Sequence, residues 1–510
     1  MIFQRLTSFF AAAVLSVFIL AFPPGGYAVV EEFKYLLFLA LCGGYCAAIV
    51  IIRAQLALTG ILPPGKPSDF IRSIPAAGKL CLLFLFFTVL SALLSVYDGT
   101  FFGAFRREGV LTITIYVLVC IFVSKYFRPQ KWMLFLLGAT ACLFCLLSFV
   151  QLTGANPFGL YPEGLNYYGA GVYYSGEFLG TLGNAGLGAA FLSITAGVFS
   201  MALVKFDFRQ KWIPAIPLFL AALQLFEAGV DAGVLALAAG SLIMLPIAVT
   251  SRKGLQRTLF VFAVVGAAFA LSRALIFGDG YIRFRPDAPT PIISAGLAAV
   301  FAVLSAVAAK TIYLEKIPPR LYRVCAAAVV LAVMCFAALY LWLYSGESSG
   351  MIYEASEVLR GRWDDNFGTR RVYIWRNVMS GVSENLLLGT GPDTLGFWGI
   401  APFTRYSEEL GRLFVAEIDA AHNEYMHILA CTGLFSLLSY LGALGLAAVK
   451  WFRFSDNPLC AVSGAGVLFY CIQAFFGISM NAIAPLFWIV FAVTIATNEG
   501  GIPDAKKERN

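Results

Sequence analysis

The sequence predicts an all-α polytopic membrane protein, a single integral domain over residues 1–510. Three observations predict this class: 60% of the residues are hydrophobic, only 13% are charged, and the mean hydropathy is +0.81. Soluble domains carry roughly 25% charged residues. Apolar runs recur along the whole chain, and a helix needs about 20 such residues to cross the hydrocarbon core of a bilayer.

These runs predict about fourteen spanning helices, and at least twelve. The first run resembles a signal peptide, but it lacks a small-residue cleavage site, so we expect it to remain as a helix. The predicted segments are 6–22, 35–52, 78–97, 109–127, 132–152, 178–204, 213–227, 229–250, 256–277, 289–309, 322–345, 422–449, 457–476 and 478–497.

The basic residues give this set of helices an orientation. With the N-terminus inside, the inner loops and helix ends hold 23 of the 36 lysines and arginines, and the short outer loops and helix ends hold six, Lys34 among them. Cytoplasmic loops are enriched in these residues. We therefore expect both termini inside, a polar cytoplasmic tail at 498–510, and a large extracytoplasmic loop at 346–421. The net charge of +7 follows from this bias and from attraction to anionic membrane lipids, so it indicates no nucleic acid.

The loop 346–421 is the place with room for chemistry. It holds seven arginines and no lysine, and the planar guanidinium suits phosphate oxygens. Arg370, Arg371 and Arg376 fall within seven residues, where we expect an amphipathic helix on the outer bilayer surface. Its expected apolar stripe is Val372, Trp375, Met379 and Val382. The alternative is an ordinary interfacial helix whose arginines only snorkel.

The chain has two histidines, His422 and His427, both at the start of an apolar run. Positions five apart on a helix diverge by roughly 140°, so the pair predicts no metal site. The positive end of a helix favours a neutral imidazole at His422, which can act as a general base. Asp419 either caps the helix or orients His422, and His427 packs or forms hydrogen bonds. The alternative is a chance cluster in a histidine-poor chain.

Four motifs occur in order around this loop. In chain order they are Gly180-Thr181-Leu182-Gly183-Asn184, Arg371-Val372-Tyr373-Ile374-Trp375, Leu387-Leu388-Gly389-Thr390-Gly391-Pro392, and Ala421-His422-Asn423-Glu424-Tyr425 with the following Gly433. Together they resemble the signatures of the O-antigen ligase and polymerase superfamily of bacterial membrane glycosyltransferases. A leucine stands where this family usually has proline in the glycine-rich turn, and Ala185 and Gly186 replace the last two residues of its stretch after Asn184.

The resemblance implies a reaction and roles. A glycan would pass from undecaprenyl diphosphate to a hydroxyl of a glycan, lipid or protein at the outer face of the bacterial cytoplasmic membrane, without metal or other cofactor. His422 would be the base and Arg371 would hold the diphosphate. Further diphosphate contacts would come from Arg370, Arg376, Arg106 and Arg107, and supporting roles from Asn423, Glu424, Asp419, Trp375, Asn184 and Asp231. The acceptor stays open: ligase, polymerase and protein-glycosylating enzymes differ mainly there.

Asp231 departs from the family pattern, because an arginine usually stands at the corresponding helix end. Three interpretations follow. Another arginine substitutes, with Arg106, Arg107 and Arg273 as the outer-face candidates; a divalent ion bridges Asp231 and the diphosphate; or the chain has lost the family's chemistry. We favour the first, because Arg106-Arg107-Glu108-Gly109 resembles an arginine-and-glycine loop of this superfamily.

Two other functions remain as alternatives. A flippase or transporter of lipid-linked glycans usually carries ionisable residues within its spans, whereas the middles of these spans are nearly free of charge. Glu227 and Asp231 are the residues to watch, and we expect both at an outer boundary. A catalytically inactive relative that scaffolds envelope synthesis is the third possibility.

Overall fold

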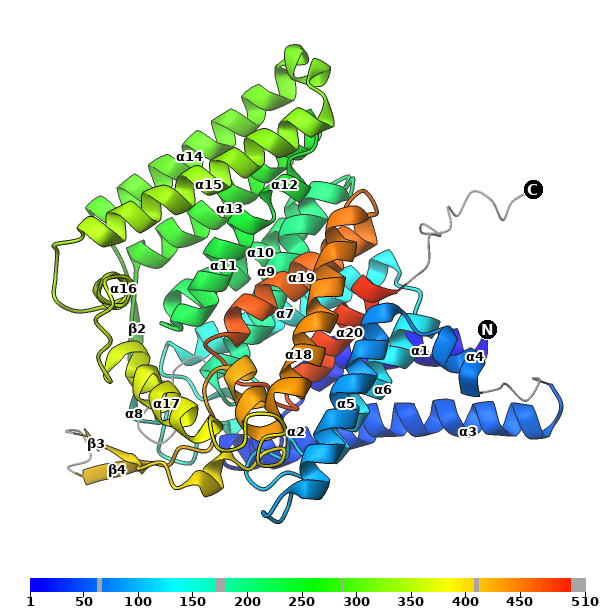
Figure 1. Ribbon diagram of the computed structural model, residues 1–510. Coiled ribbons are helices and arrows are strands. Elements are labelled where there is room, and N and C mark those ends of the chain that lie inside the picture. Colours follow the sequence, from blue (N-terminus) through cyan, green and yellow to red (C-terminus); the bar gives the residue numbers. More distant parts are fainter. Residues whose placement is uncertain (62–66, 171–178, 286–287, 408–411, 497–510) are drawn as a thin grey trace.

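The computed structural model describes residues 1–61, 67–170, 179–285, 288–407 and 412–496, and it is mostly helical (Figure 1). The first half comprises α1 (Ile2–Ala13), η1 (Val14–Phe18), η2 (Gly26–Val29), α2 (Val30–Phe38), η3 (Leu39–Gly43), α3 (Gly44–Leu58), α4 (Pro67–Arg72), α5 (Ala76–Leu94), α6 (Val110–Tyr126), α7 (Lys131–Gln151), η4 (Pro157–Gly159), α8 (Tyr167–Ala170), α9 (Ala185–Lys205), α10 (Trp212–Glu227), α11 (Asp231–Ile243) and α12 (Leu245–Ala248). The labels η mark 3₁₀ or π segments.

The second half contains the two small sheets. It comprises α13 (Arg252–Ala274), β1 (Leu275–Gly278), β2 (Tyr281–Phe284), α14 (Pro289–Lys310), η5 (Ile312–Lys316), α15 (Pro319–Leu343), α16 (Met351–Leu359), α17 (Phe367–Val382), η6 (Leu395–Trp398), β3 (Phe403–Ser407), β4 (Arg412–Ala416), α18 (Glu424–Arg453), α19 (Pro458–Ala474) and α20 (Ala484–Ile495). Each sheet is a two-stranded antiparallel hairpin, β1–β2 or β3–β4.

The apolar helices agree with the predicted spans. Within the described residues, eight helices are long and apolar enough to cross a membrane, and six shorter apolar helices accompany them. Each predicted segment overlaps one of these helices. The chain is therefore a multi-pass membrane protein, and the exact number of spans stays a prediction.

Helix α9 forms the centre of the bundle and is buried along its whole length. It packs against α10, α11 and α19. Small residues allow this: a Cβ at Gly197 would come within 2.6 Å of the carbonyl oxygen of Ala465 in α19. Close approach through small residues is the usual way in which membrane helices pack.

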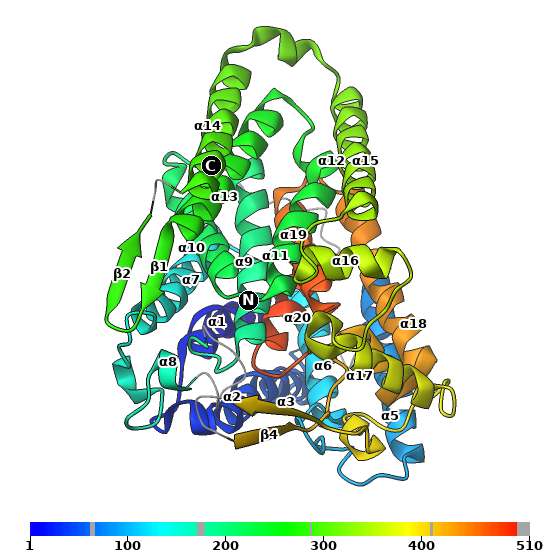
Figure 2. The ribbon, with the colours of Figure 1, turned by 90° about the vertical axis from the view of Figure 1, so that its left-hand side faces the viewer.

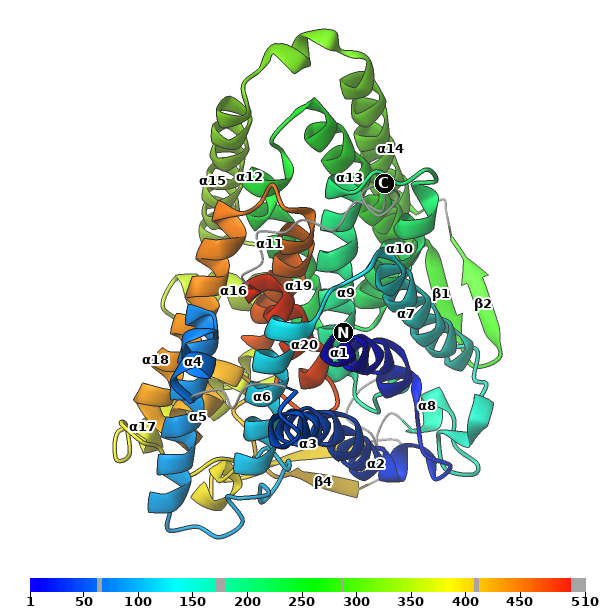
Figure 3. The same cartoon turned by 90° about the vertical axis from the view of Figure 1, so that its right-hand side faces the viewer.

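Helices α14 and α15 form the edge of the bundle. They are joined through η5 and stand on opposite sides, α14 against α13 and α15 beside α12 (Figures 2 and 3). Most of the large apolar side chains of α15 are exposed. In a bilayer this surface would face lipid rather than protein, because nothing else in the described chain covers it.

Contacts between loops sort the helix ends into two groups, as the alternation predicted. Figure 1 shows α16, α17 and the β3–β4 hairpin at one end of the bundle and the α14–α15 connection at the other. We call these the His422 end and the Lys450 end. At the His422 end, hydrogen bonds join loops through Arg106–Asp419 and Gly280–Thr153. At the Lys450 end, a hydrogen bond joins Lys125 to Ser73, and ion pairs join Arg252 to Glu315 and Arg323 to Asp456. Which end faces the cytoplasm stays a prediction.

The structure corrects several boundaries. The predicted segment 256–277 leaves the helix at Ala274, because Asp279 and Gly280, with a φ of +71° at the glycine, turn the chain into the β1–β2 hairpin, as Asp-Gly pairs often do. The fold remains mostly helical with few strands, which agrees with the predicted all-α class. Lys34 lies not in an outer loop but in α2, fully buried, and donates to the carbonyls of Phe18 and Ile19 at 2.6 and 2.9 Å. The predicted tail 498–510 lies outside the described residues.

Candidate functional site

The segment 386–393 docks into a break in α18. The backbone N–H of Leu434 donates to the carbonyl of Leu386 (2.8 Å), and that of Gly391 donates to the carbonyl of Cys431 (2.7 Å). Gly433 interrupts α18 with a φ of +83°, and a Cβ there would come within 2.3 Å of the Leu387 carbonyl oxygen. The two glycine-bearing motifs therefore form one structural unit, and only glycine fits at Gly433.

Asp393, at the end of this segment, holds the loop between α5 and α6. Its Oδ2 accepts from the backbone N–H groups of Phe105 (2.9 Å) and Arg106 (2.7 Å). Burial raises the pKa of the Asp393 carboxyl, and these N–H groups oppose the shift. Asp393 was not among the predicted site residues, although it follows directly after the Gly-Thr-Gly-Pro turn.

Arg106 reaches from that loop to the approach of α18. Its Nη2 lies 2.6 Å from Oδ1 of Asp419, and its Nη1 lies 3.5 Å from the sulfur of Met480. Asp419 thus pairs with an arginine instead of capping the helix. The Nε of Arg106 is buried without a hydrogen-bond partner among the described residues. One donor of the guanidinium therefore remains unused.

Helix α17 packs on the other side of the same segment. Its buried residues are Val372, Ile374, Val378 and Val382, and the last three pack in a cluster with Leu395 and Ile418. Of the predicted apolar stripe, Val372 and Val382 are therefore buried, whereas Met379 is exposed; the contact of α17 with the bilayer surface stays a prediction. The Nε1 of Trp375 donates to the carbonyl of Ala421 at 2.9 Å, which fixes α17 beside the residue that precedes His422.

Arg371 is the arginine of α17 that faces the site. Its Nη1 donates to the Gly368 carbonyl (3.0 Å) and lies 3.2 Å from the Thr369 hydroxyl oxygen, and its buried Nε has no partner among the described residues. Burial lowers its pKa from the ordinary value, and the carboxylates of Asp231 and Glu354 oppose this shift. Arg371 therefore lies near two carboxylates without an ion pair to either, within the described chain.

His422 lies close enough to both Arg106 and Arg371 to interact with them electrostatically. Burial, together with the positive charges of Arg106 and Arg371, lowers its pKa to about 4, and Asp419 only partly opposes this. The side chain is therefore a neutral imidazole at physiological pH. Its backbone has a φ of +47°, the left-handed region that non-glycine residues rarely adopt and that is enriched at functional sites.

The other predicted arginines contact different partners. Arg370 lies over the ring of Phe403, 4.9 Å from its centre. Arg376 is exposed and pairs with Asp365 at 2.7 Å. Arg107 faces α2, over the ring of Tyr35 at 5.0 Å and 3.6 Å from a Glu32 carboxylate oxygen. These contacts do not connect any of the three to His422.

The residues after His422 fix the start of α18. The Oδ1 of Asn423 caps the helix by accepting from the Met426 N–H at 3.0 Å. Both carboxylate oxygens of Glu424 accept from tyrosines, 2.6 Å from the Tyr440 hydroxyl and 2.8 Å from the Tyr470 hydroxyl. Asn423 and Glu424 therefore hold the helix in place. The Nε2 of His427 lies 3.7 Å from the sulfur of Cys431, which agrees with the predicted packing role.

Asn184 and Asp231 both begin helices. Asn184 caps α9, accepting from the N–H groups of Gly186 and Leu187 at 2.8 and 3.2 Å. Asp231 begins α11 and lies near enough to Arg371 to affect its pKa. The carboxylate that stands where an arginine was expected thus faces an arginine from another element.

A cavity of about 70 Å³ lies beneath the site and is lined in part by Arg106, Glu108, Asp393, Glu424 and His427. Glu108 accepts from the Tyr116 hydroxyl at 2.8 Å. Burial raises the pKa of Glu108 to about 8, against the effect of that hydrogen bond. Glu108 belongs to the predicted arginine-and-glycine loop, but no role was predicted for it.

Comparison with known families finds one match. The model of the O-antigen ligase family matches residues 290–441, which span α14 to the middle of α18. The matched region includes Arg371, Asp393 and His422, whereas Arg106 and Asp231 lie outside it. A search of curated proteins finds no match. The family match points to a membrane glycosyltransferase or ligase. Residues 290–441 of this chain match the O-antigen ligase family, and this match supports membership of that superfamily.

Proposed function

We propose that this protein transfers a glycan from undecaprenyl diphosphate to an acceptor hydroxyl, on the outer face of the bacterial cytoplasmic membrane and without metal. The observation that carries the proposal is that His422 is buried and close enough to Arg106 and Arg371 for both positive charges to lower its pKa, which keeps the imidazole neutral. A neutral base near two cations suits a reaction in which a proton leaves one substrate while negative charge grows on another.

His422 would remove the proton from the acceptor hydroxyl. The oxygen then attacks the anomeric carbon of the donor sugar, and the bond from that carbon to the diphosphate oxygen breaks. The electron pair leaves with undecaprenyl diphosphate, whose negative charge increases. A pKa of about 4 keeps His422 available as a base at neutral pH but makes it a weak one, so most of the barrier reduction has to come from stabilising the leaving group.

Arg371 and Arg106 would stabilise that leaving group. Each has a buried Nε without a partner among the described residues, and fixed donors directed at developing charge typically contribute about 10²–10³ in rate. Arg106 comes from the loop that we expected to compensate for Asp231. In this proposal Asp231 orients Arg371 instead of contacting the diphosphate, which removes the need for a bridging cation.

An aromatic cluster beside the site would accept the first isoprenoid units of the carrier. Trp375 packs edge-on against Phe475, with ring centres 5.8 Å apart, and lies 5.9 Å from Phe476. Phe475 is 45% exposed, so its apolar surface is available. Arg371 and Trp375 are four apart on α17 and lie on similar faces of the helix, so this surface would adjoin the diphosphate contact.

The test uses purified full-length protein in lipid nanodiscs with labelled undecaprenyl-diphosphate glycan and candidate glycan, lipid or protein acceptors. The informative variant is His422→Asn, because asparagine tolerates a positive φ better than alanine does and removes the base. We expect glycan transfer to fall by about 10²–10⁴ with an unchanged thermal unfolding midpoint. The matched control, His427→Gln, should retain transfer.

Two outcomes would contradict the proposal. Transfer at the wild-type rate by His422→Asn would remove the proposed base. Movement of the carrier between leaflets without any transfer to an acceptor would favour the flippase alternative.

A further inference from the structure

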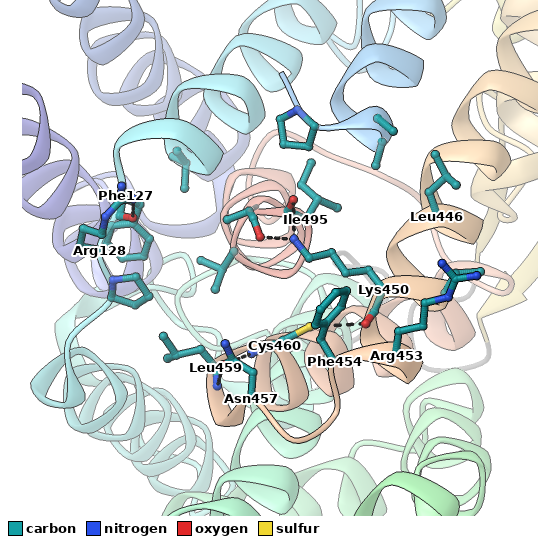
Figure 4. A pocket seen from close by; sticks show the side chains of 18 residues that line it. Phe127, Arg128, Leu446, Lys450, Arg453, Phe454, Asn457, Leu459, Cys460 and Ile495 are labelled. Atoms are coloured by element: carbon teal, nitrogen blue, oxygen red, sulfur yellow. Dashed lines mark hydrogen bonds between the residues drawn. The ribbon is translucent and has the colours of Figure 1, made fainter. Parts of the chain in front are cut away.

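A second cavity, of about 640 Å³, lies at the Lys450 end of the bundle, opposite the His422 site. Five parts of the chain form it: the start of α5, the turn between α6 and α7, the end of α18, the start of α19 and the end of α20 (Figure 4). The proposed transfer reaction does not use this cavity, and the family match ends at residue 441, before most of its lining residues.

The charged residues in the lining are all cations. Arg128, Lys450 and Arg453 belong to the lining, which contains no carboxylate among its described residues. Figure 4 shows Lys450 extended across the cavity towards the carbonyl of Ile495, to which its Nζ donates at 3.0 Å; it also donates to the carbonyl of Ala496. Arg128 and Arg453 lie on opposite sides of the Lys450 side chain (Figure 4), and both arginines are exposed.

The remaining lining is mostly apolar and continues onto an exposed apolar surface. Leu446 and Val449 belong to both the cavity and the outer surface of α18, with 40% and 47% of each side chain exposed. Phe454 is 47% exposed at the mouth. An apolar strip that ends in three cations matches an amphiphile that has acyl chains and an anionic head.

We propose that this cavity binds an acidic glycerophospholipid of the leaflet at the Lys450 end, with its phosphate among Arg128, Lys450 and Arg453 and its chains along Leu446 and Val449. Basic pockets between spanning helices are known to hold anionic lipid headgroups. A free phosphate ion would use the cations but not the apolar walls. The proposal depends on the chain being a membrane protein and not on the transfer reaction.

The test measures binding of fluorescent phosphatidylglycerol to the purified full-length protein in detergent. We use Arg453→Gln and Arg128→Gln, because both side chains are exposed and their loss leaves the Lys450 hydrogen bonds intact. Each should weaken binding about fivefold, the expected effect of one cation near a phosphate. The matched control is Arg320→Gln, an exposed arginine at the start of α15 that is absent from the lining, and it should bind as the wild type does.

Competition separates the possible ligands. Unlabelled phosphatidylglycerol should displace the probe, whereas phosphatidylcholine and inorganic phosphate at the same concentration should not. Displacement by inorganic phosphate would identify a simple anion site and overturn the proposal. Equal binding of phosphatidylcholine, or an equal loss in Arg320→Gln and Arg453→Gln, would also overturn it.

Discussion

Arg106 and Arg371, the two arginines that lower the pKa of His422, are held in different ways. Arg106 is fixed from several sides: its backbone N–H donates to Asp393, its side chain pairs with Asp419, and its carbonyl accepts from Asn481 at 3.4 Å. Arg371 is held by the Gly368 carbonyl and the Thr369 hydroxyl, both within its own helix start. One cation is already neutralised by a carboxylate, and the other is not.

This difference assigns different work to the two side chains. A guanidinium with an ion-pair partner is preorganised, but the negative charge of that partner weakens its attraction for an anionic ligand. An unpaired, buried guanidinium is costly for the folded protein and has more to gain from an anionic ligand. We therefore expect Arg371 to be the stronger diphosphate contact and Arg106 to position and support.

The largest expected effect is from Arg371→Gln. Transfer should fall by about 10²–10³ because a donor to the leaving group is lost, and the unfolding midpoint should stay the same or rise, because a buried unpaired charge is removed. The control is Arg376→Gln, which breaks a surface pair with Asp365 and should leave transfer unchanged. Equal losses in both variants would mean that α17 acts through its overall charge.

Arg106→Gln should have a smaller effect on transfer, about tenfold, but a larger effect on stability, because Asp419 is left without its partner. The double variant Arg106→Gln/Asp419→Asn should recover the unfolding midpoint without recovering transfer. Thermal unfolding in detergent and the transfer assay measure the two quantities separately. Recovery of transfer in the double variant would contradict a diphosphate role for Arg106.

The folded protein should also become less stable as the pH rises, because of Glu108 in the loop that carries Arg106. Glu108 has a pKa of about 8 in the folded protein, above the usual value of about 4.3 in an unfolded chain. Between these two values the folded state holds a proton that the unfolded state has released, so stability falls with rising pH and levels off above about pH 8. Glu108→Gln should reduce the fall in the unfolding midpoint between pH 5 and pH 8; an unchanged fall would contradict this.

The smallest effect concerns the acid limit of activity. With a pKa of about 4, His422 is unprotonated across the neutral range, so transfer should be independent of the protonation of His422 above about pH 5 and should decline below it. Removing a neighbouring positive charge favours the protonated imidazole and raises its pKa. The acid limit of Arg106→Gln should therefore lie at a higher pH than that of the wild type, and a shift to lower pH would exclude this electrostatic coupling.

Much of the fold was predictable from the sequence because apolar run length is a local property. A stretch of about 20 apolar residues is sufficient to define a spanning helix, and the alternation of basic residues orders the ends. The incorrect boundaries and faces occur where a helix cap or a contact with a distant segment overrides the apolar pattern. The predicted segment 178–204 was too long because Asn184 starts α9 by capping it. The apolar stripe on α17 was only partly correct, because the burial of this helix depends on contacts with distant residues such as Leu395 and Ile418.

The site was predictable only in part. The histidine and arginine motifs predicted His422 and Arg371 as site residues, and the structure brings the two close enough to interact. Composition alone did not separate Arg371 from Arg370 and Arg376; the resemblance to the family singled out Arg371. It also gave no sign that Asp393 holds the Arg106 loop, since these residues lie far apart in the chain.

By itself the sequence determined a multi-pass helical membrane protein, with its polar chemistry concentrated around one long connection. That much follows from hydropathy, charge and short motifs, which need no knowledge of how helices pack. Only the tertiary structure decided which charges meet: Arg106 pairs with Asp419, Arg371 lies near Asp231, and both guanidiniums lie near enough to His422 to lower its pKa. The physical reason is that burial and pairing set the state of each charged group, and both arise from contacts between distant segments.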